Sequence, residues 1–226
     1  MYEYPDPEKT HSKIHYSTMI TAHSGAEGTE DNTLESLHVM LSTGADAVEV
    51  DVMSHDSTLY LSHDPMIPQK KYATLKDAFS ILAAVPDILM NIDVKTAGLI
   101  DDIVLLARFA SVQNRIIITG DVGPGDYHAI KKNSIQLWMD EYLLPESQRR
   151  HPLRGVEQHG FWIVNIDIQR TNDLLLKEQP ERFSVWTVND EETLRKLLLL
   201  GVKNITTCAP CLALRLREEI QRPCTK

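Results

Sequence analysis

The chain has 226 residues, enough to bury one large hydrophobic core, and 42% of them are hydrophobic, which excludes a disordered protein. The formal net charge is −9, and no run of Lys or Arg is longer than two residues. This pattern argues against a general nucleic-acid or anionic-membrane surface, so we expect no nucleic-acid partner.

Sequence features that direct proteins to membranes or to the cell exterior are not visible. The first ten residues lack the basic start and apolar core of a signal peptide. No apolar stretch approaches the ~20 residues that span a bilayer. The three cysteines all follow position 207, which makes a secreted disulfide framework improbable. We therefore expect a cytoplasmic protein without a membrane span, and the sequence leaves its oligomeric state open.

From residue 17 onward, short apolar runs alternate with amphipathic segments. Residues 1–16 are polar and are predicted to be a lead-in to one domain over residues 17–222. Strands are predicted at 17–23, 47–52, 58–64, 88–95, 116–121, 135–140, 161–167, 183–188 and 204–208. Helices are predicted at 32–43, 74–84, 99–112, 190–200 and 210–221. Asn32 and Glu35 give the first helix a start that resembles a capping box.

Alternation of strands and helices along the whole chain indicates an α/β protein with a parallel sheet, either open and doubly wound or closed into a (β/α)8 barrel. Polar residues stand at the strand ends: His23, Asp51, His63, Asp64, Asp93, Lys95, Asp121, Asp140, Asp167 and Asn189. Sites built from the carboxyl ends of many strands are typical of barrels, so we predict a single-domain TIM barrel. Nine strand candidates compete for eight places, and one of them must be a lead-in, an extension or a misreading.

The segment AVEVDV, residues 47–52, is the strongest candidate for a functional centre. Side chains alternate along a strand, so Glu49 and Asp51 share one face and the valines share the other. Two like charges on a buried strand are costly unless a cation or protons neutralise them. One divalent metal ion with oxygen ligands, Mg or Ca, is the economical explanation.

A second strand, at 88–95, adds Asp93 and Lys95, which are two residues apart and face the same way. One such pair alone is equally well explained as a structural ion pair or a satisfied buried acid. Two histidines, His23 and His63, also end predicted strands, where they suit general base and general acid duties. Together, a metal, a lysine and two histidines meet the requirements of phosphodiester cleavage.

The order and spacing of several short motifs resemble those of the glycerophosphodiester phosphodiesterase family, a metal-dependent group with a TIM-barrel fold. These motifs are AHSGAEGTEDNTLESL, GADAVEVDV, LYLSHDP, MNIDVK, VWTVND and GVKNITTCAP, and they span about residues 17 to 215. The resemblance implies the catalytic histidines His23 and His63, the metal ligands Glu49, Asp51 and Asp93, and the substrate contacts Lys95 and Trp186. It also implies a small-molecule phosphodiester substrate, which is hydrolysed to glycerol phosphate and an alcohol through a cyclic phosphate.

The sequence departs from the family pattern at several positions. Ser24 stands where the family usually has Arg after the first histidine, and Lys70 or Lys71 is a candidate to replace that phosphate contact. Asp31 and Asp93 each replace a Glu. Two other functions therefore stay open: a phospholipase D-like lyase that stops at the cyclic phosphate, and a catalytically degenerate barrel that binds a phosphorylated ligand.

One further motif, CAPC, places Cys208 and Cys211 at the start of the last predicted helix. This is a redox-motif spacing, but in thioredoxin-like domains the motif follows the first strand of a compact βαβ unit. Its place after the last strand weighs against such a redox role.

Overall fold

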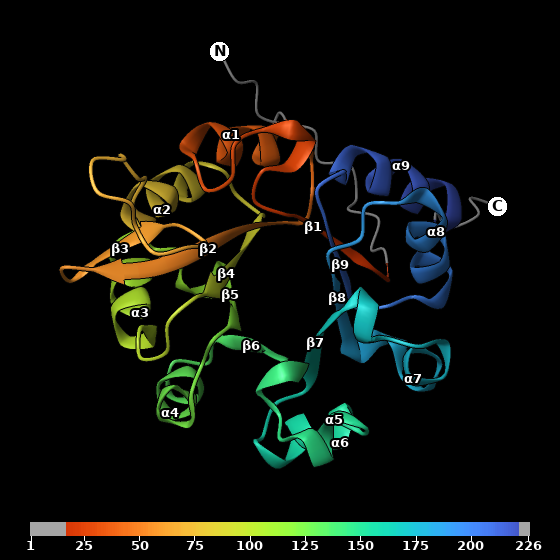
Figure 1. The fold of residues 1–226 in the computed structure, drawn as a ribbon. Helices are drawn as coiled ribbons and strands as arrows, with labels where there is room; N and C mark the ends of the chain where they lie inside the picture. The colour runs from red at the N-terminus through yellow and green to blue at the C-terminus, as the bar shows by residue number, and fades with distance from the viewer. Residues whose placement is uncertain (1–16, 222–226) are drawn as a thin grey trace.

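The computed structural model describes residues 17–221, so the predicted lead-in at 1–16 lies outside the described residues. Within this range, parallel strands form a closed barrel surrounded by helices (Figure 1). The barrel strands are β1 Met19–Ala22, β2 Ala47–His55, β4 Leu89–Val94, β5 Ile116–Gly120, β6 Gln136–Asp140, β7 Ile163–Asp167, β8 Phe183–Trp186 and β9 Asn204–Thr207. Strand β1 pairs in parallel with both β9 and β2 and so closes the ring. The predicted (β/α)8 TIM barrel is confirmed.

The ninth strand candidate is an extension outside the ring. It is β3, Thr58–Leu61, which pairs antiparallel with the far end of β2. The hairpin turns at Asp56 and Ser57, whose φ values of 46° and 59° match the left-handed backbone of a tight two-residue hairpin. The sequence analysis left open which candidate was supernumerary, and the antiparallel pairing of β3 answers that question.

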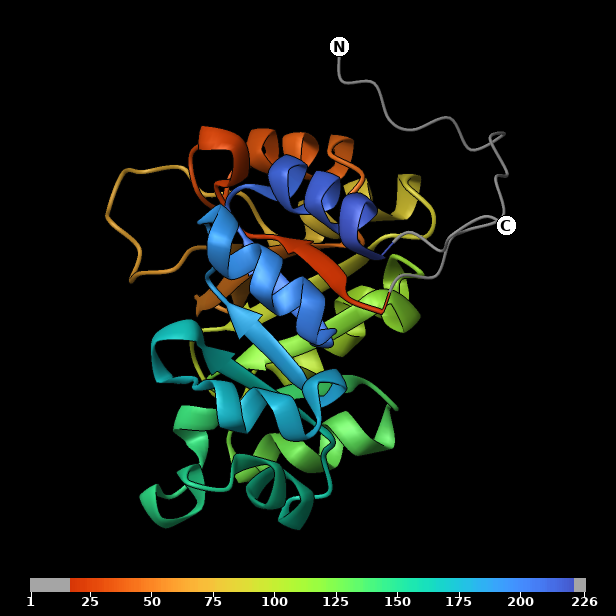
Figure 2. The same ribbon diagram turned by 90° about the vertical axis from the view of Figure 1, so that its right-hand side faces the viewer.

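Helices cover the outside of the barrel, as the view turned by 90° also shows (Figure 2). They are α1 Leu34–Ser42, α2 Leu75–Ala84, α3 Ile100–Phe109, α4 Pro124–Lys132, α5 Glu146–Arg149, α6 Pro152–Gln158, α7 Asp173–Glu178, α8 Glu191–Leu200 and α9 Pro210–Gln221. The main hydrophobic core joins the outward side chains of the strands, such as Val48 and Ile92, to buried helix residues such as Phe79. Among the described residues, no helix is long and apolar enough to cross a bilayer.

Helix α1 begins later than predicted. Its N-cap is Thr33, whose side-chain oxygen accepts a hydrogen bond from the backbone N–H of Ser36. Asn32 precedes the cap and has a left-handed backbone with φ of 59°. The prediction that Asn32 and Glu35 cap this helix was therefore wrong, and the Asn32 side chain is free for another partner.

The barrel interior changes from apolar to polar along its axis. Near the amino ends of the strands, Ile117, Trp138 and Ile163 form a small buried cluster, against which Met19 and Leu89 pack. Further along the barrel axis, the side chains that point inward are polar, and they form hydrogen bonds with one another. A buried polar group without such a partner would be costly. The Thr21 hydroxyl donates to Asn204 Oδ1 (2.7 Å), and the Thr119 hydroxyl donates to Asn91 Oδ1 (3.1 Å). The polar side chains of the interior therefore lie toward the carboxyl end of the barrel.

Gly120, at the end of β5, occupies a position that has no room for a side chain. Its φ is +85°, and a Cβ there would lie 2.1 Å from Asp93 Oδ1 and 2.3 Å from the Val94 carbonyl oxygen. We expect Gly120→Ala to lower the free energy of unfolding by about 2 kcal/mol or more, from backbone strain and overpacking. The measurement is urea-induced unfolding.

The matched control for this change is Gly125→Ala, within helix α4, where an added Cβ meets no atom within 4 Å. Alanine is the better helix former, so the stability should stay the same or rise slightly. Equal stability of the two variants would contradict the close approach at Gly120.

Candidate active site

A cavity of about 150 Å³ opens at the carboxyl end of the barrel. It is lined by His23, Glu49, Asp51, His63, Asn91, Asp93, Lys95, Thr119, Asp140, Tyr142, Asn165, Trp186, Thr187 and Thr206. All the residues that the sequence analysis assigned to a site are among them. Among these assigned residues, the structure brings together side chains that are up to 163 positions apart, from His23 to Trp186.

Three carboxylates form the acidic part of this cavity. Glu49 and Asp51 lie on β2, and Asp93 lies on β4 directly opposite Asp51 in the parallel ladder. Each offers one oxygen, and these oxygens all lie within 4.8 Å of one another. Glu49 and Asp51 are buried, only 4% and 3% exposed. Such a cluster is electrostatically costly by itself, because like charges at this distance repel strongly out of water.

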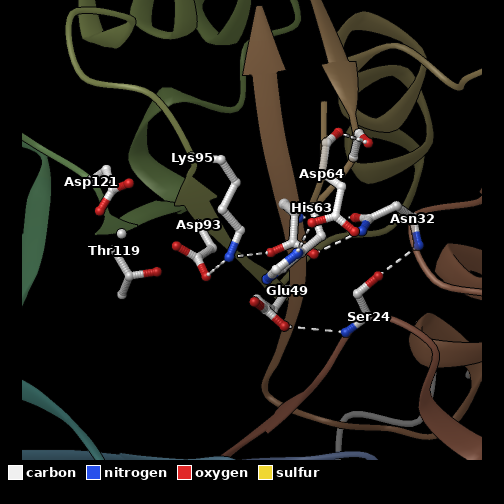
Figure 3. Close-up of polar contacts among 12 residues, drawn as sticks. Ser24, Asn32, Glu49, His63, Asp64, Asp93, Lys95, Thr119 and Asp121 are labelled. Atoms are coloured by element: carbon white, nitrogen blue, oxygen red, sulfur yellow. Dashed lines mark hydrogen bonds and ion pairs between the residues drawn. The ribbon is translucent and has the colours of Figure 1, made fainter. Parts of the chain in front are cut away.

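Lys95 partly neutralises the cluster. Its ammonium lies 2.8 Å from Asp51 Oδ1 and 2.7 Å from Asp93 Oδ2 (Figure 3). Burial opposes the charged ammonium, but the two carboxylates outweigh it and raise the pKa of Lys95. The pKa of Asp93 is also raised, mainly by burial and against the opposing effect of Lys95. The structural ion pair left open by the sequence is therefore present, and it is part of the same acidic cluster.

Asn32 is a site residue that the sequence analysis missed. Its amide group donates to Asp51 Oδ2 (2.7 Å), and its oxygen accepts from the backbone N–H of Asp51 (2.9 Å). The left-handed backbone that this requires is one that Asn tolerates well. The Ser24 hydroxyl oxygen in turn accepts the Asn32 backbone N–H (2.7 Å), as Figure 3 shows. The interpretation of Asn32 as a helix cap concealed this role.

His23, which follows β1, is held firmly against the acidic cluster. Its Nδ1 donates to the Ser24 carbonyl oxygen (2.6 Å), and its Nε2 lies 3.7 Å from Glu49 Oε2. Burial disfavours the imidazolium, but the charge of Glu49 outweighs it and raises the pKa of His23 to about 10. Burial raises the pKa of Glu49 to about 7, against the opposing effect of His23. The two groups form a closely coupled pair.

His63 occupies a different position from His23. It follows β3, outside the ring, so the prediction that both histidines end equivalent strands was wrong in this detail. Its side chain is 64% exposed, and its Nδ1 donates to Asp64 Oδ1 (3.0 Å). His63 nevertheless lines the same cavity as the carboxylates, and it therefore stands at the rim of the site.

The opposite wall of the cavity holds further groups at the strand ends. Asp140, at the end of β6, accepts hydrogen bonds from the Gly120 backbone N–H (2.7 Å) and the Asn165 amide (2.8 Å). Burial, with a smaller contribution from the charge of Asp93, raises the pKa of Asp140 well above its ordinary value. The Tyr142 hydroxyl donates to Asp121 Oδ1 (3.1 Å).

Within the part of the chain that the structure describes, no guanidinium group lining the first cavity replaces the arginine that the family pattern has after its first histidine. The Ser24 side chain is buried and is engaged by Asn32. Lys70 and Lys71 line a neighbouring cavity of about 560 Å³, where Lys70 pairs with Glu30 (3.3 Å). Neither lysine lines the first cavity, so the structure does not support the idea that they replace the arginine. Among the described residues that line the first cavity, Lys95 is the one lysine or arginine.

The fold and the cavity define a (β/α)8 barrel with an acidic site at the carboxyl ends of its strands. No protein-family model and no curated protein match this sequence. Solved structures do resemble it, and several are glycerophosphodiester phosphodiesterases. One from Parabacteroides distasonis has 18% identity and a TM-score of 0.73, and the match covers 90% of this chain and 98% of that one.

Two other solved structures extend this similarity. A glycerophosphodiester phosphodiesterase from Thermotoga maritima has 19% identity and a TM-score of 0.70, with 90% of this chain and 100% of that one covered. A phosphodiesterase from Oleispira antarctica, in complex with its product sn-glycerol-3-phosphate, has 16% identity and a TM-score of 0.70, with 88% and 96% covered. At these identities the similarity establishes a common fold, and the activity has to be argued from the site.

The raised pKa of Asp140 predicts how stability depends on pH. Above about pH 4, the unfolded chain loses the proton of this carboxyl while the folded protein keeps it. The contribution of Asp140 therefore makes stability fall as pH rises from about 4 toward its folded pKa, by at most about 1.4 kcal/mol per pH unit. We expect Asp140→Asn to remove this slope and to be more stable than the wild type at neutral pH.

Thermal unfolding of both proteins between pH 3 and 8 measures this difference. The amide oxygen of the variant can still accept the Gly120 N–H, and Asn165 can rotate its amide to present its oxygen. Asp56→Asn, at the exposed hairpin turn, is the control and should follow the wild-type curve. Parallel curves for wild type and Asp140→Asn would show that Asp140 is ionised in the folded protein.

Proposed function

We propose that the protein is a metal-dependent phosphodiesterase that hydrolyses glycerophosphodiesters to glycerol phosphate and an alcohol. The observation that carries this proposal is the convergence of three carboxylates, Lys95 and two histidines on one cavity. The fold shared with solved glycerophosphodiester phosphodiesterases supports it. So does the glycerol phosphate product bound to the Oleispira antarctica phosphodiesterase.

The acidic cluster fits a divalent cation. Glu49, Asp51 and Asp93 offer only oxygen atoms, which are the ligands that Mg²⁺ and Ca²⁺ prefer. Asn32 and the backbone N–H of Ser24 fix the orientation of two of these carboxylates. When bound, the cation would supply positive charge that stabilises the phosphoryl oxygens. Lys95 lies between Asp51 and Asp93 and can add its ammonium to the same oxygens.

The two histidines supply proton transfer in the proposed reaction. Attack of a glycerol hydroxyl on phosphorus requires a base, and departure of the alcohol requires an acid. His23 is oriented by the Ser24 carbonyl and His63 by Asp64, and both line the cavity. Water then opens the cyclic phosphate with the two roles exchanged. Trp186 lines the same cavity and offers an apolar ring to the carbon atoms of glycerol.

Two other functions differ from this proposal in their products. A lyase would stop at the cyclic phosphate, and a degenerate barrel would bind a phosphorylated ligand without turnover. The engaged, uncharged Ser24 in place of an arginine favours the degenerate barrel. Phosphorus NMR of the products separates all three outcomes. The choice between Mg and Ca and the cytoplasmic location stay predictions.

Metal binding tests the acidic cluster directly. Calorimetric titration of the chelator-treated protein with Mg²⁺ and with Ca²⁺ should show one site. Glu49→Gln and Asp93→Asn each remove one charged ligand, so affinity should fall by at least about tenfold. Asp102→Asn, on the exposed face of α3, should bind as the wild type does. Full turnover in the presence of EDTA would contradict the metal role.

Substitution of His63 tests the acid and base assignment. We expect His63→Ala to reduce turnover of glycerophosphocholine by about 10² to 10⁴-fold, because one proton transfer loses its partner. Metal affinity should not change. His55→Ala is a matched control, since the His55 side chain is 63% exposed and that of His63 is 64% exposed. If the two variants turn over substrate equally fast, His63 has no part in the mechanism.

A further inference from the structure

The two cysteines of the CAPC motif lie beside the candidate active site. Cys208 directly follows β9, and Cys211 lies in the first turn of α9. Strand β9 is the neighbour of β1, with Thr207 opposite Ala22, and the His23 backbone N–H donates to the Thr207 carbonyl (2.9 Å). This register places Cys208 next to His23, at the mouth of the barrel.

The side chains confirm this proximity. Burial lowers the pKa of His23 and Glu49 raises it, and the Cys208 side chain also contributes to the rise, as expected of a thiol near the imidazole. Cys208 is partly exposed and Cys211 is exposed, and neither is in a disulfide. A small reagent in solution can therefore reach the pair. A chemical change at the Cys208 sulfur would alter the surroundings of the His23 imidazole.

Glu27 connects both cysteines to the segment that follows His23. The backbone N–H of Glu27 donates to the Cys208 carbonyl oxygen (2.9 Å). The backbone N–H of Cys211 donates to Glu27 Oε1 (3.0 Å), and burial together with this carboxylate raises the pKa of the Cys211 thiol. The start of α9 and the 3-10 turn Ala26–Gly28 are thus held together around the two thiols.

We propose that Cys208 and Cys211 are a redox-active thiol pair that a small-molecule disulfide oxidises to an intramolecular disulfide, and that this oxidation changes the environment of His23. An effect on turnover follows from it and rests on the proposed function. The position of the pair beside His23 carries the proposal. The thioredoxin-like context that the sequence analysis considered plays no part in it.

The chemistry proceeds by two exchange steps. The Cys208 sulfur attacks one sulfur of the small disulfide, with its proton passing to water, and the first small thiol leaves. The Cys211 sulfur then attacks the mixed disulfide at Cys208, and the second small thiol leaves. In sum, the cysteines lose two electrons and two protons, and the small disulfide becomes two thiols. Burial and the carboxylate of Glu27 raise the pKa of the Cys211 thiol, which favours Cys208 as the attacking residue.

A disulfide here converts the Cys208 thiol beside His23 into a bridged sulfur. It also removes the thiol proton of Cys211, whose backbone N–H donates to Glu27. Ala209 and Pro210 alone separate the two residues in sequence, with Cys208 before the helix and Cys211 in its first turn. Oxidation therefore changes the surroundings of both His23 and Glu27.

Mass spectrometry of the full chain tests the bond itself. Trypsin should release residues 204–215, which contain Cys208 and Cys211, while Cys224 falls in a separate peptide. After treatment of the reduced protein with oxidised glutathione, the 204–215 peptide should lose two hydrogen atoms and regain them with dithiothreitol. Cys224→Ser should behave like the wild type. Cys211→Ser should instead trap glutathione on Cys208.

The imidazole NMR signals of His23, assigned with His23→Gln, test the coupling without any assay of turnover. We expect these signals to shift on oxidation of the wild type and of Cys224→Ser, and to return on reduction. The signals of His128, which is remote on α4, should stay unchanged. If no disulfide forms in the 204–215 peptide, the thiol pair is refuted. If it forms and the His23 signals stay in place, the coupling is refuted.

Turnover of glycerophosphocholine is the third measurement. A reversible loss of at least about tenfold on oxidation is expected. An inactive reduced protein would count against the proposed function alone, because the mass and NMR measurements do not depend on turnover. Full activity of the disulfide form would overturn the effect on the active site.

Discussion

Mutual repulsion among Glu49, Asp51 and Asp93 is the constraint on which the arrangement of the rest of the site depends. Their oxygens lie within 4.8 Å of one another, and two of the three carboxylates are almost fully buried. Lys95 lies between Asp51 and Asp93. The Asn32 amide also donates to Asp51, and the backbone N–H of Ser24 donates to Glu49. Each neighbour offers positive charge or a donor hydrogen, so the protein itself offsets part of the repulsion, and the three carboxylate oxygens could still hold a metal ion.

The layers of side chains inside the barrel keep this charged cluster apart from the hydrophobic core. Apolar side chains close the amino end, and hydrogen-bonded polar side chains such as Thr21 and Asn204 fill the middle. The hydrophobic core that stabilises the fold lies instead between the ring and the helices. Stability and chemistry therefore depend on opposite faces of the same strands. This separation lets β2 carry Val48 and Val50 outward while Glu49 and Asp51 face inward.

The sequence was sufficient to predict the barrel, because side-chain alternation and the order of elements can be read from local patterns. The seven residues to which the family resemblance assigned roles all line the cavity, and their roles stay predictions. It was insufficient where a residue had two local explanations. Asn32 fits a helix cap as well as a left-handed turn, and only the distant contact with Asp51 decides between them. Strand β3 has the pattern of a barrel strand, and its antiparallel pairing with β2 depends on a two-residue turn. The same holds for Asp140, whose burial results from the closure of the ring.

The placement of His63 after β3 has a consequence for how a substrate can lie. His23 is anchored to the ring through β1 and β9, whereas His63 follows a strand that lies outside the ring and pairs with β2. It also borders both the small acidic cavity and its larger neighbour. In the proposed reaction, the phosphate would lie over the acidic cluster, and the larger neighbouring cavity offers space for the alcohol, so His63 would stand where the two parts of the substrate meet.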